Sequence, residues 1–91
     1  MHNDSNTKLH KNYPNPFNPV TTIRAYLPQP ADVTLKVYNI LGQEVATLID
    51  NERRFGEVTA QWDASGMASG IYLYRLTAGK KVKTGRMLLM K

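Results

Sequence analysis

From Val20 onward, apolar and polar residues alternate along the chain with a period of two, and β-branched and aromatic residues are frequent. The segment 32–38 is the clearest case, because Val33, Leu35 and Val37 alternate there with Thr34 and Lys36. Such alternation predicts a strand with one buried and one solvated face. Turn-forming residues separate similar segments, which predicts strands at 21–27, 32–38, 44–49, 57–62, 70–78 and from the turn at 78–80 onward.

The breaks between these segments have identifiable causes. Pro28 and Pro30 end the first strand, because proline has no backbone N–H to donate. Gly42 allows a positive φ in a short turn at 40–43, and 50–56 is expected to be a charged loop. Strands with such spacing and no plausible helix predict an all-β fold, an antiparallel immunoglobulin-like β-sandwich of six to seven strands.

Two aromatic positions favour the immunoglobulin-like topology. Tyr72 stands two residues before the bulky Tyr74 at the start of a strand, which is the spacing of a tyrosine corner, whose hydroxyl bonds to the backbone upstream. Trp62 is expected to be the large core aromatic. The alternative is that Tyr72 and Tyr74 are ordinary strand tyrosines that pack across a pair.

The N-terminal part of the chain differs from the rest. Residues 1–11 are polar and predict a flexible lead-in or an expression remnant, and 12–91 is expected to be the folded domain. Three prolines in 13–19 exclude helix and predict an extended segment laid over the domain, with Tyr13 and Phe17 as anchors. The chain contains no signal-peptide-like stretch and no apolar run of transmembrane length.

Length and charge narrow the function classes. With 91 residues and no cysteine, the chain predicts one domain with a thin core and no disulfide or thiolate metal site. The net charge of +5 divides into +1 for residues 1–20, −1 for 21–79 and +5 for 80–91. This excess at one end suggests a feature that is recognised there rather than a polyanion-binding surface. The basic residues concerned are Lys80, Lys81, Lys83, Arg86 and Lys91.

Candidates for catalysis and for ligand binding are weak. His2 and His10 lie in the polar lead-in and cannot form a tetrahedral metal site, while Asp63 and Ser65 have no histidine base nearby and are expected to cap a loop. The glycines form no phosphate-binding loop, and aromatic residues are not interleaved with the basic ones. We therefore expect no catalytic, metal or cofactor-binding residues, no small-molecule substrate and no nucleic-acid partner.

Several separated blocks resemble the type A C-terminal sorting domain of the type IX secretion system. These blocks are YPNPFNP at 13–19, VTLKVYNILGQEV at 33–45, WDASG at 62–66, GIYLYRL at 70–76 and MLLMK at 87–91. The resemblance implies a non-catalytic last domain of a secreted protein, preceded by a cargo. It further implies recognition by an outer-membrane translocon, removal by a sortase-like peptidase, and export through the periplasm to the outer membrane, cell surface or medium. Without a cargo or signal peptide, this chain is expected to be an excised domain.

Two other functions remain open. The same blocks are shared more loosely with the immunoglobulin-like domain of the flagellar hook-capping protein, which would make the chain a structural module. A carbohydrate-binding accessory module of a secreted enzyme would need coplanar exposed aromatics, for which Tyr26, Tyr38 and Phe55 are the candidates, although ordinary packing is the simpler interpretation.

We expect the partner to recognise the final strand. An edge strand offers backbone hydrogen bonds to a partner strand, and Leu88 and Met90 could fill pockets there beside the basic residues of 80–91. The alternative is that 87–90 completes the core, and both can hold, one for each face. Lysines 81 and 83 share strand parity with Met87 and Leu89, so a β-bulge at Gly85–Arg86 is predicted to let both lysines face solvent while Val82, Met87 and Leu89 face inward.

Overall fold

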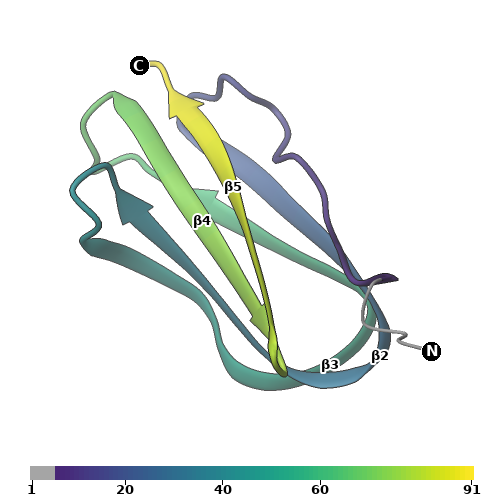
Figure 1. Ribbon diagram of the computed structural model, residues 1–91. Helices are drawn as coiled ribbons and strands as arrows, with labels where there is room; N and C mark the ends of the chain where they lie inside the picture. Colours follow the sequence, from purple (N-terminus) through teal and green to yellow (C-terminus); the bar gives the residue numbers. More distant parts are fainter. Residues whose placement is uncertain (1–5) are drawn as a thin grey trace.

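The fold is a five-stranded antiparallel sheet that is folded over on itself (Figure 1). The computed structural model describes residues 6–91. In order along the sheet, β1 pairs with β2, β2 with β4 and β4 with β5, while β3 also pairs with β2. The strands are β1 (Lys8–Leu9), β2 (Val20–Asn39), β3 (Glu44–Asp63), β4 (Gly70–Ala78) and β5 (Lys81–Leu89).

The hairpin of β2 and β3 bends at its middle, so that its two halves face each other across the core (Figure 1). One half pairs Val20–Leu27 with 56–63, and the other half of β2 pairs on its second edge with β4. The bend coincides with a register shift between Leu27 and Ala31, where Pro28 and Pro30 cannot donate to the ladder. The all-β antiparallel structure is thus confirmed, but the predicted sandwich of six to seven strands is not, because the sheet has five strands.

Two predicted breaks are wrong for a common reason. The prolines bend β2 without ending it, and the charged segment 50–56 continues β3 instead of forming a loop. Asn51 and Gly56 have positive φ values of 51° and 78°, which lets β3 follow the bend of β2. Two continuous, bent strands therefore replace the strand end and the loop that the sequence suggested.

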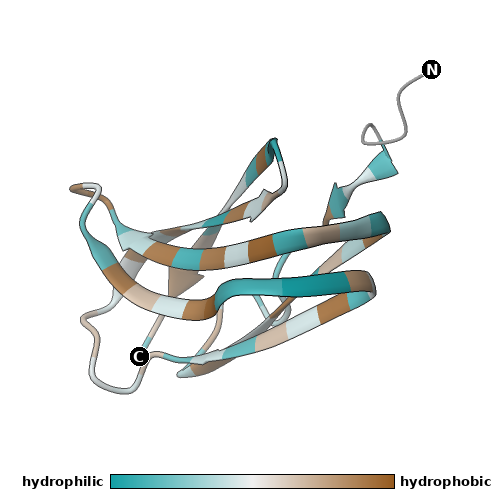
Figure 2. Cartoon of the chain, turned by 90° about the horizontal axis from the view of Figure 1, so that it is seen from below, coloured by the Kyte–Doolittle hydropathy of each residue, from teal (hydrophilic) through white to brown (hydrophobic). Residues whose placement is uncertain are grey.

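The core lies between the facing halves of the folded sheet, and the alternation of hydropathy along the strands is visible in Figure 2. Trp62 is buried, as predicted, and its ring contacts those of Phe17 and Tyr72 at centroid distances of 5.8 and 5.2 Å. The Tyr72 hydroxyl donates a 2.6 Å hydrogen bond to the carbonyl oxygen of Ala68. This upstream bond is the contact expected of a tyrosine corner.

The segment before β2 lies between β2 and β5, because Tyr13 forms a bridge with Thr22 and Phe17 forms one with Leu89, and we call residues 12–19 the strap. β1 pairs with β2 through Lys8 opposite Tyr26 and Leu9 opposite Ala25. Phe17 is a buried anchor, as predicted, whereas Tyr13 is 78% exposed, so that anchor was wrong. His2, which we considered as a metal ligand, lies outside the described residues, and the division of the chain at residue 12 stays a prediction.

Candidate recognition surface

β5 is a regular strand, and the predicted bulge at Gly85–Arg86 is wrong. Its pairing with β4 runs without interruption from Lys81 opposite Ala78 to Leu89 opposite Gly70. Met87 and Leu89 are buried as predicted, whereas Met90 is 55% exposed. Val82 is 57% exposed, so its predicted inward position is wrong. The parity conflict that motivated the bulge must therefore be resolved in another way.

Gly85 is needed for packing and not for a bulge. It lies opposite Tyr74 on β4, and a Cβ at this position would overlap the ring and hydroxyl of Tyr74. The ring lies across Gly85 and reaches the beginning of the strap. Its hydroxyl donates to the carbonyl oxygen of His10, just before the strap, at 3.1 Å and accepts from the N–H of Asn12, the first residue of the strap, at 3.2 Å. Burial raises the pKa of this hydroxyl, while the bond from Asn12 acts in the opposite direction.

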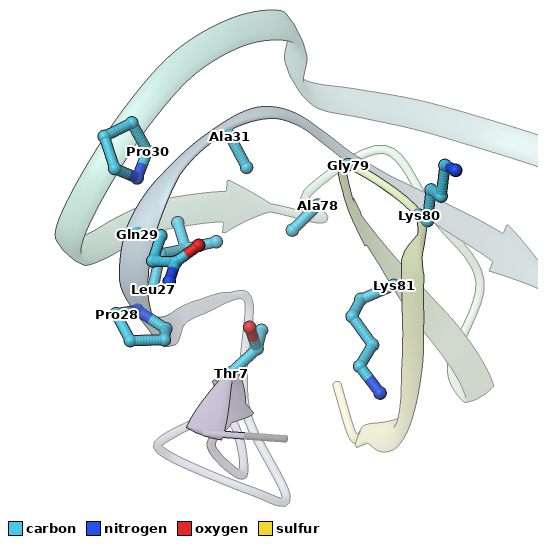
Figure 3. Close-up of a pocket in the computed structure, with 10 residues that line it drawn as sticks. All are labelled: Thr7, Leu27, Pro28, Gln29, Pro30, Ala31, Ala78, Gly79, Lys80 and Lys81. Atoms are coloured by element: carbon cyan, nitrogen blue, oxygen red, sulfur yellow. The ribbon is translucent and has the colours of Figure 1, made fainter. Parts of the chain in front are cut away.

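Near the first residues of β5, the side of the strand that carries Met87 borders surface hollows and not the closed core. The lysines at these positions can therefore reach solvent. Lys81 lines a hollow beside Thr7 and Pro28, and Figure 3 shows its side chain extending along β5 while Lys80 is directed away from Thr7. Lys83 lines a second hollow, formed with the lead-in. Both lysines are half-buried, so long side chains running along the surface replace the bulge.

The edge of β5 is closed by the strap at Arg86–Met90. The Asn15 side chain accepts from the Leu88 N–H at 3.0 Å and donates to the Arg86 carbonyl at 3.4 Å. Phe17 forms a parallel β-bridge with Leu89. Its N–H donates to the carbonyl oxygen of Leu88 and its carbonyl oxygen accepts from the Met90 N–H, each at 3.0 Å. Backbone pairing with a partner strand, as expected from the sequence, would therefore require this part of the strap to leave.

The last residue is also held in place. The Lys91 N–H donates to Ser69 Oγ at 3.1 Å, and its ammonium donates to the carbonyl oxygen of Ser65 at 2.6 Å. Lys91 thereby ties the end of the chain to the loop between β3 and β4. Its charge remains exposed at the surface.

The structure divides the residues predicted for recognition between two sides of β5. Lys81 and Lys83 are on the side of Met87, and Lys80 lies in the preceding turn. Arg86, Leu88 and Met90 are on the opposite, outward side. The seven residues Lys80, Lys81, Lys83, Arg86, Leu88, Met90 and Lys91 thus do not form one cluster, and their role in binding stays a prediction.

Ile71 and Leu73 were missed by the sequence reasoning, and they join the outward group. They lie on β4 directly opposite Leu88 and Arg86, and they are 42% and 39% exposed. The signal was available in the sequence, because Ile71 and Leu73 alternate with Tyr72 and Tyr74 and so lie on the opposite face of the strand. Apolar residues at solvent-facing positions of a short strand would have indicated this surface.

Asp63 and Ser65 have a structural role in the loop before β4. Asp63 accepts hydrogen bonds from the N–H and the hydroxyl of Ser65, and these bonds hold the pKa of its carboxyl below the usual range. This is the loop cap predicted from the sequence. Within residues 6–91, no three side chains of His, Cys, Asp or Glu gather as a metal site would require. Among the same residues, no helix has the length and apolarity to cross a membrane.

Comparison with known proteins identifies the family. A model described as the secretion system C-terminal sorting domain matches residues 11–90. The chain belongs to this family. The resemblance noted in the sequence is thereby confirmed, and membership makes the domain a sorting signal of a secretion system.

A solved structure supports the fold. The chain is similar to PorZ, described as an essential bacterial surface component of the type IX secretion system of Porphyromonas gingivalis, with a TM-score of 0.61 and 23% sequence identity. The similarity covers 96% of this sorting domain but 12% of the PorZ chain, so the domain corresponds to a small part of that protein. No curated protein matches.

Proposed function

We propose that this sorting domain is a folded, non-catalytic export signal, which the type IX machinery recognises as a surface and not as an unstructured tail. The observation that carries the proposal is the fixation of residues 86–91, since the strap, β4 and the loop before β4 all bind this segment. In the precursor, a cargo precedes the domain and crosses the periplasm with it to the outer membrane. The cargo then reaches the cell surface or the medium once a sortase-like peptidase has removed the domain.

The architecture supports an immunoglobulin-like interpretation of the fold. Because β2 and β3 each bend, each contributes two strand segments, and with β4 and β5 the fold presents six segments around one core. This corresponds to a small sandwich in which the corner-turning strands are continuous. Such a module can stand at the end of many different cargoes without depending on their structure.

The proposal is tested by fusing the whole chain to the C-terminus of a fluorescent protein that carries a signal peptide, in a host with type IX machinery. Residues 7–11 are included because His10 bonds to Tyr74 and Thr7 is buried. We expect fluorescence at the cell surface or in the medium, and in the periplasm when the host lacks the translocon. Equal distribution in both hosts would refute the proposal.

A sugar-binding function receives no support from the aromatic residues. The Tyr38 ring is covered by the Arg75 guanidinium, 4.8 Å from its centroid, and lies on the other side of the β2 bend from Tyr26. We therefore expect titration with soluble polysaccharides to give no saturable change in Trp or Tyr fluorescence. Copurification with flagellar components would instead favour the hook-cap alternative.

A further inference from the structure

The outward surface of β4 and β5 carries an apolar patch, which we call the outer face and define by Ile71, Leu73, Leu88 and Met90. Ile71 lies directly opposite Leu88, and Met90 follows two positions later with 55% of its surface exposed. On a strand pair whose other side already fills the core, such residues add nothing to the packing of the interior. Contiguous exposed apolar residues on a small domain indicate an interaction site.

The outer face contains two hollows, and it continues into exposed apolar residues of the neighbouring β2–β3 turn. One hollow is lined by Ile71 and Leu88 against Pro16 of the strap, and another by Leu73 against Tyr38 and Gly42. Gly42 belongs to the β2–β3 turn, whose residues Ile40 and Leu41 are 72% and 77% exposed. The patch therefore reaches from the end of β5 across β4 to this turn, with recesses in which partner side chains can fit.

Charges around the outer face are positive. Arg86 lies opposite Leu73, and Arg75 follows Leu73 by two positions on β4. The nearby carboxylate of Glu44 is engaged with Lys36 at 3.1 Å, and its bonds with Thr47 and Lys36 hold its pKa below the usual range. Two cations beside an apolar patch favour an occupant that brings carboxylates to the rim and apolar side chains to the centre.

The same features disfavour other modes of binding. A second copy packed face to face would bring its own Arg75 and Arg86 to the rim of the contact and add positive charge there, which is unfavourable across an interface. Addition of a strand to β5 is blocked where Asn15 and Phe17 occupy its edge. The outer face is thus suited to contact through side chains with a folded surface.

We propose that the outer face is the docking surface for an apolar, acid-rimmed surface of a folded protein of the export machinery. This inference rests on the proposed function and adds to it where contact is made and with which chemistry. Leu73 is at the centre of the contact, and Arg86 is at its charged rim. Residues at the centre of an interface contribute most of its binding energy.

The test uses the reporter fusion with Leu73→Glu and Arg86→Glu, each changing one exposed side chain of the outer face. Phe55→Glu and Arg24→Glu are matched controls, because both alter exposed residues of the same type on other strands. We expect each outer-face variant to lower the exported fraction about tenfold, since a carboxylate there repels an acidic rim and lacks a partner in an apolar centre. The controls should remain close to the unchanged fusion.

Each result leads to a decision. Thermal unfolding of the purified domains checks folding, and Arg86→Glu keeps the test valid if Leu73→Glu does not fold. Retention of the unchanged fusion in the periplasm would refute the proposed function and with it this inference. Normal export of the unchanged fusion and of a folded outer-face variant would overturn the inference alone. Dimerisation, or binding to phosphatidylglycerol vesicles, that Leu73→Glu abolishes in the purified domain would also overturn it.

Discussion

Tyr74 connects three parts of the molecule through a single side chain. Its ring is buried and covers Gly85 of β5, and its hydroxyl bonds to His10 and to Asn12. These two residues precede Tyr74 by 64 and 62 positions. One tyrosine therefore fixes the distance between the N-terminal segment and the last two strands.

The first prediction concerns Gly85→Ala. The added methyl group overlaps the Tyr74 ring, which is held by its hydroxyl bonds and cannot move aside without losing them. We expect a loss of about 1–3 kcal/mol in the free energy of unfolding, measured by urea denaturation. Gly66→Ala is the control, because nothing lies within 4 Å of a Cβ there. Equal stability of the two variants would contradict the role assigned to Gly85.

The second prediction concerns Tyr74→Phe and pH. Because burial raises the pKa of Tyr74 above its ordinary value of 10.0, the neutral hydroxyl favours the folded state. This contribution is present below pH 10.0 and is lost as the pH rises through the higher pKa of the folded state. Removing the hydroxyl should cost about 1–2 kcal/mol at neutral pH and make stability fall less steeply above pH 10.

Unfolding measured by circular dichroism from pH 7 to 11 checks the second prediction. Tyr13→Phe serves as the control, since Tyr13 is exposed and its change should preserve the wild-type profile. If Tyr74→Phe showed the same alkaline slope as the wild type, the hydroxyl would not be the group responsible.

At the scale of elements, the strap acts as a short sixth strand beside β5. It supplies hydrogen bonds to Leu88 and Met90, and it buries Phe17 against Trp62. Native proteins often cover exposed sheet edges, since an open edge can pair with other chains. The strap provides such a cover with residues that lie before the first long strand.

The third prediction tests this cover through Asn15→Ala. The Leu88 N–H loses its acceptor, so its hydrogen exchange should become faster, while the exchange of amides bonded within the ladder remains slow. The cost in stability should be about 1 kcal/mol. Asn18→Ala, which changes an exposed asparagine of the same segment, should leave Leu88 protected. Unchanged exchange at Leu88 in Asn15→Ala, followed by NMR, would argue against the bond.

The same elements show how far sequence reasoning reaches. Alternation correctly predicted an all-β antiparallel fold and the core role of Trp62, because these depend on local pattern. The burial of Met87 and Leu89 was also predicted, but through a bulge that β5 does not have. It failed at Pro28, where a proline on a bending strand resembles one that ends a strand. It also failed at Gly85, whose partner is a ring from another strand, since pairing between distant segments cannot be read from one strand alone.

The candidate site was predictable in part for the same reason. The sequence directed attention to the final strand, but charge alone could not separate Lys83 from Arg86, which the structure places on opposite sides of β5. Ile71 and Leu73 become part of a surface only once the pairing of β4 with β5 is known. Blocking of the edge by Asn15 depends on a contact across 73 positions and was not predictable.

At the scale of the whole molecule, the first and last segments of the domain share one edge. Residues 6–11, the strap and β5 lie together there, whereas the bent hairpin of β2 and β3 forms the body of the fold (Figure 1). The integrity of the fold therefore depends on both ends of the chain.

The fourth prediction compares two truncations. Removing 87–91 deletes the buried Met87 and Leu89, and each such loss costs about 2–5 kcal/mol, which together approach the total stability of a small domain. We expect this chain to be unfolded. Removing 90–91 deletes only the hydrogen bond from the Met90 N–H to Phe17 and the hydrogen bonds from Lys91 to Ser69 and Ser65. The domain that ends at Leu89 should therefore still fold. A cooperative thermal transition in the chain that ends at Arg86 would contradict this prediction.

The contact between strap and β5 also has a consequence in time. The ribosome makes Asn15 73 residues before Leu88, a delay of several seconds at about 5–20 residues per second. During this interval Phe17 lacks part of its binding site, and the edge of β4 that receives β5 is unpaired. Until β5 has been translated, this unpaired edge is open to pairing with other chains. A ribosome that stalls before β5 is translated yields no folded domain. The sorting signal therefore folds only in chains in which everything encoded upstream has already been synthesised.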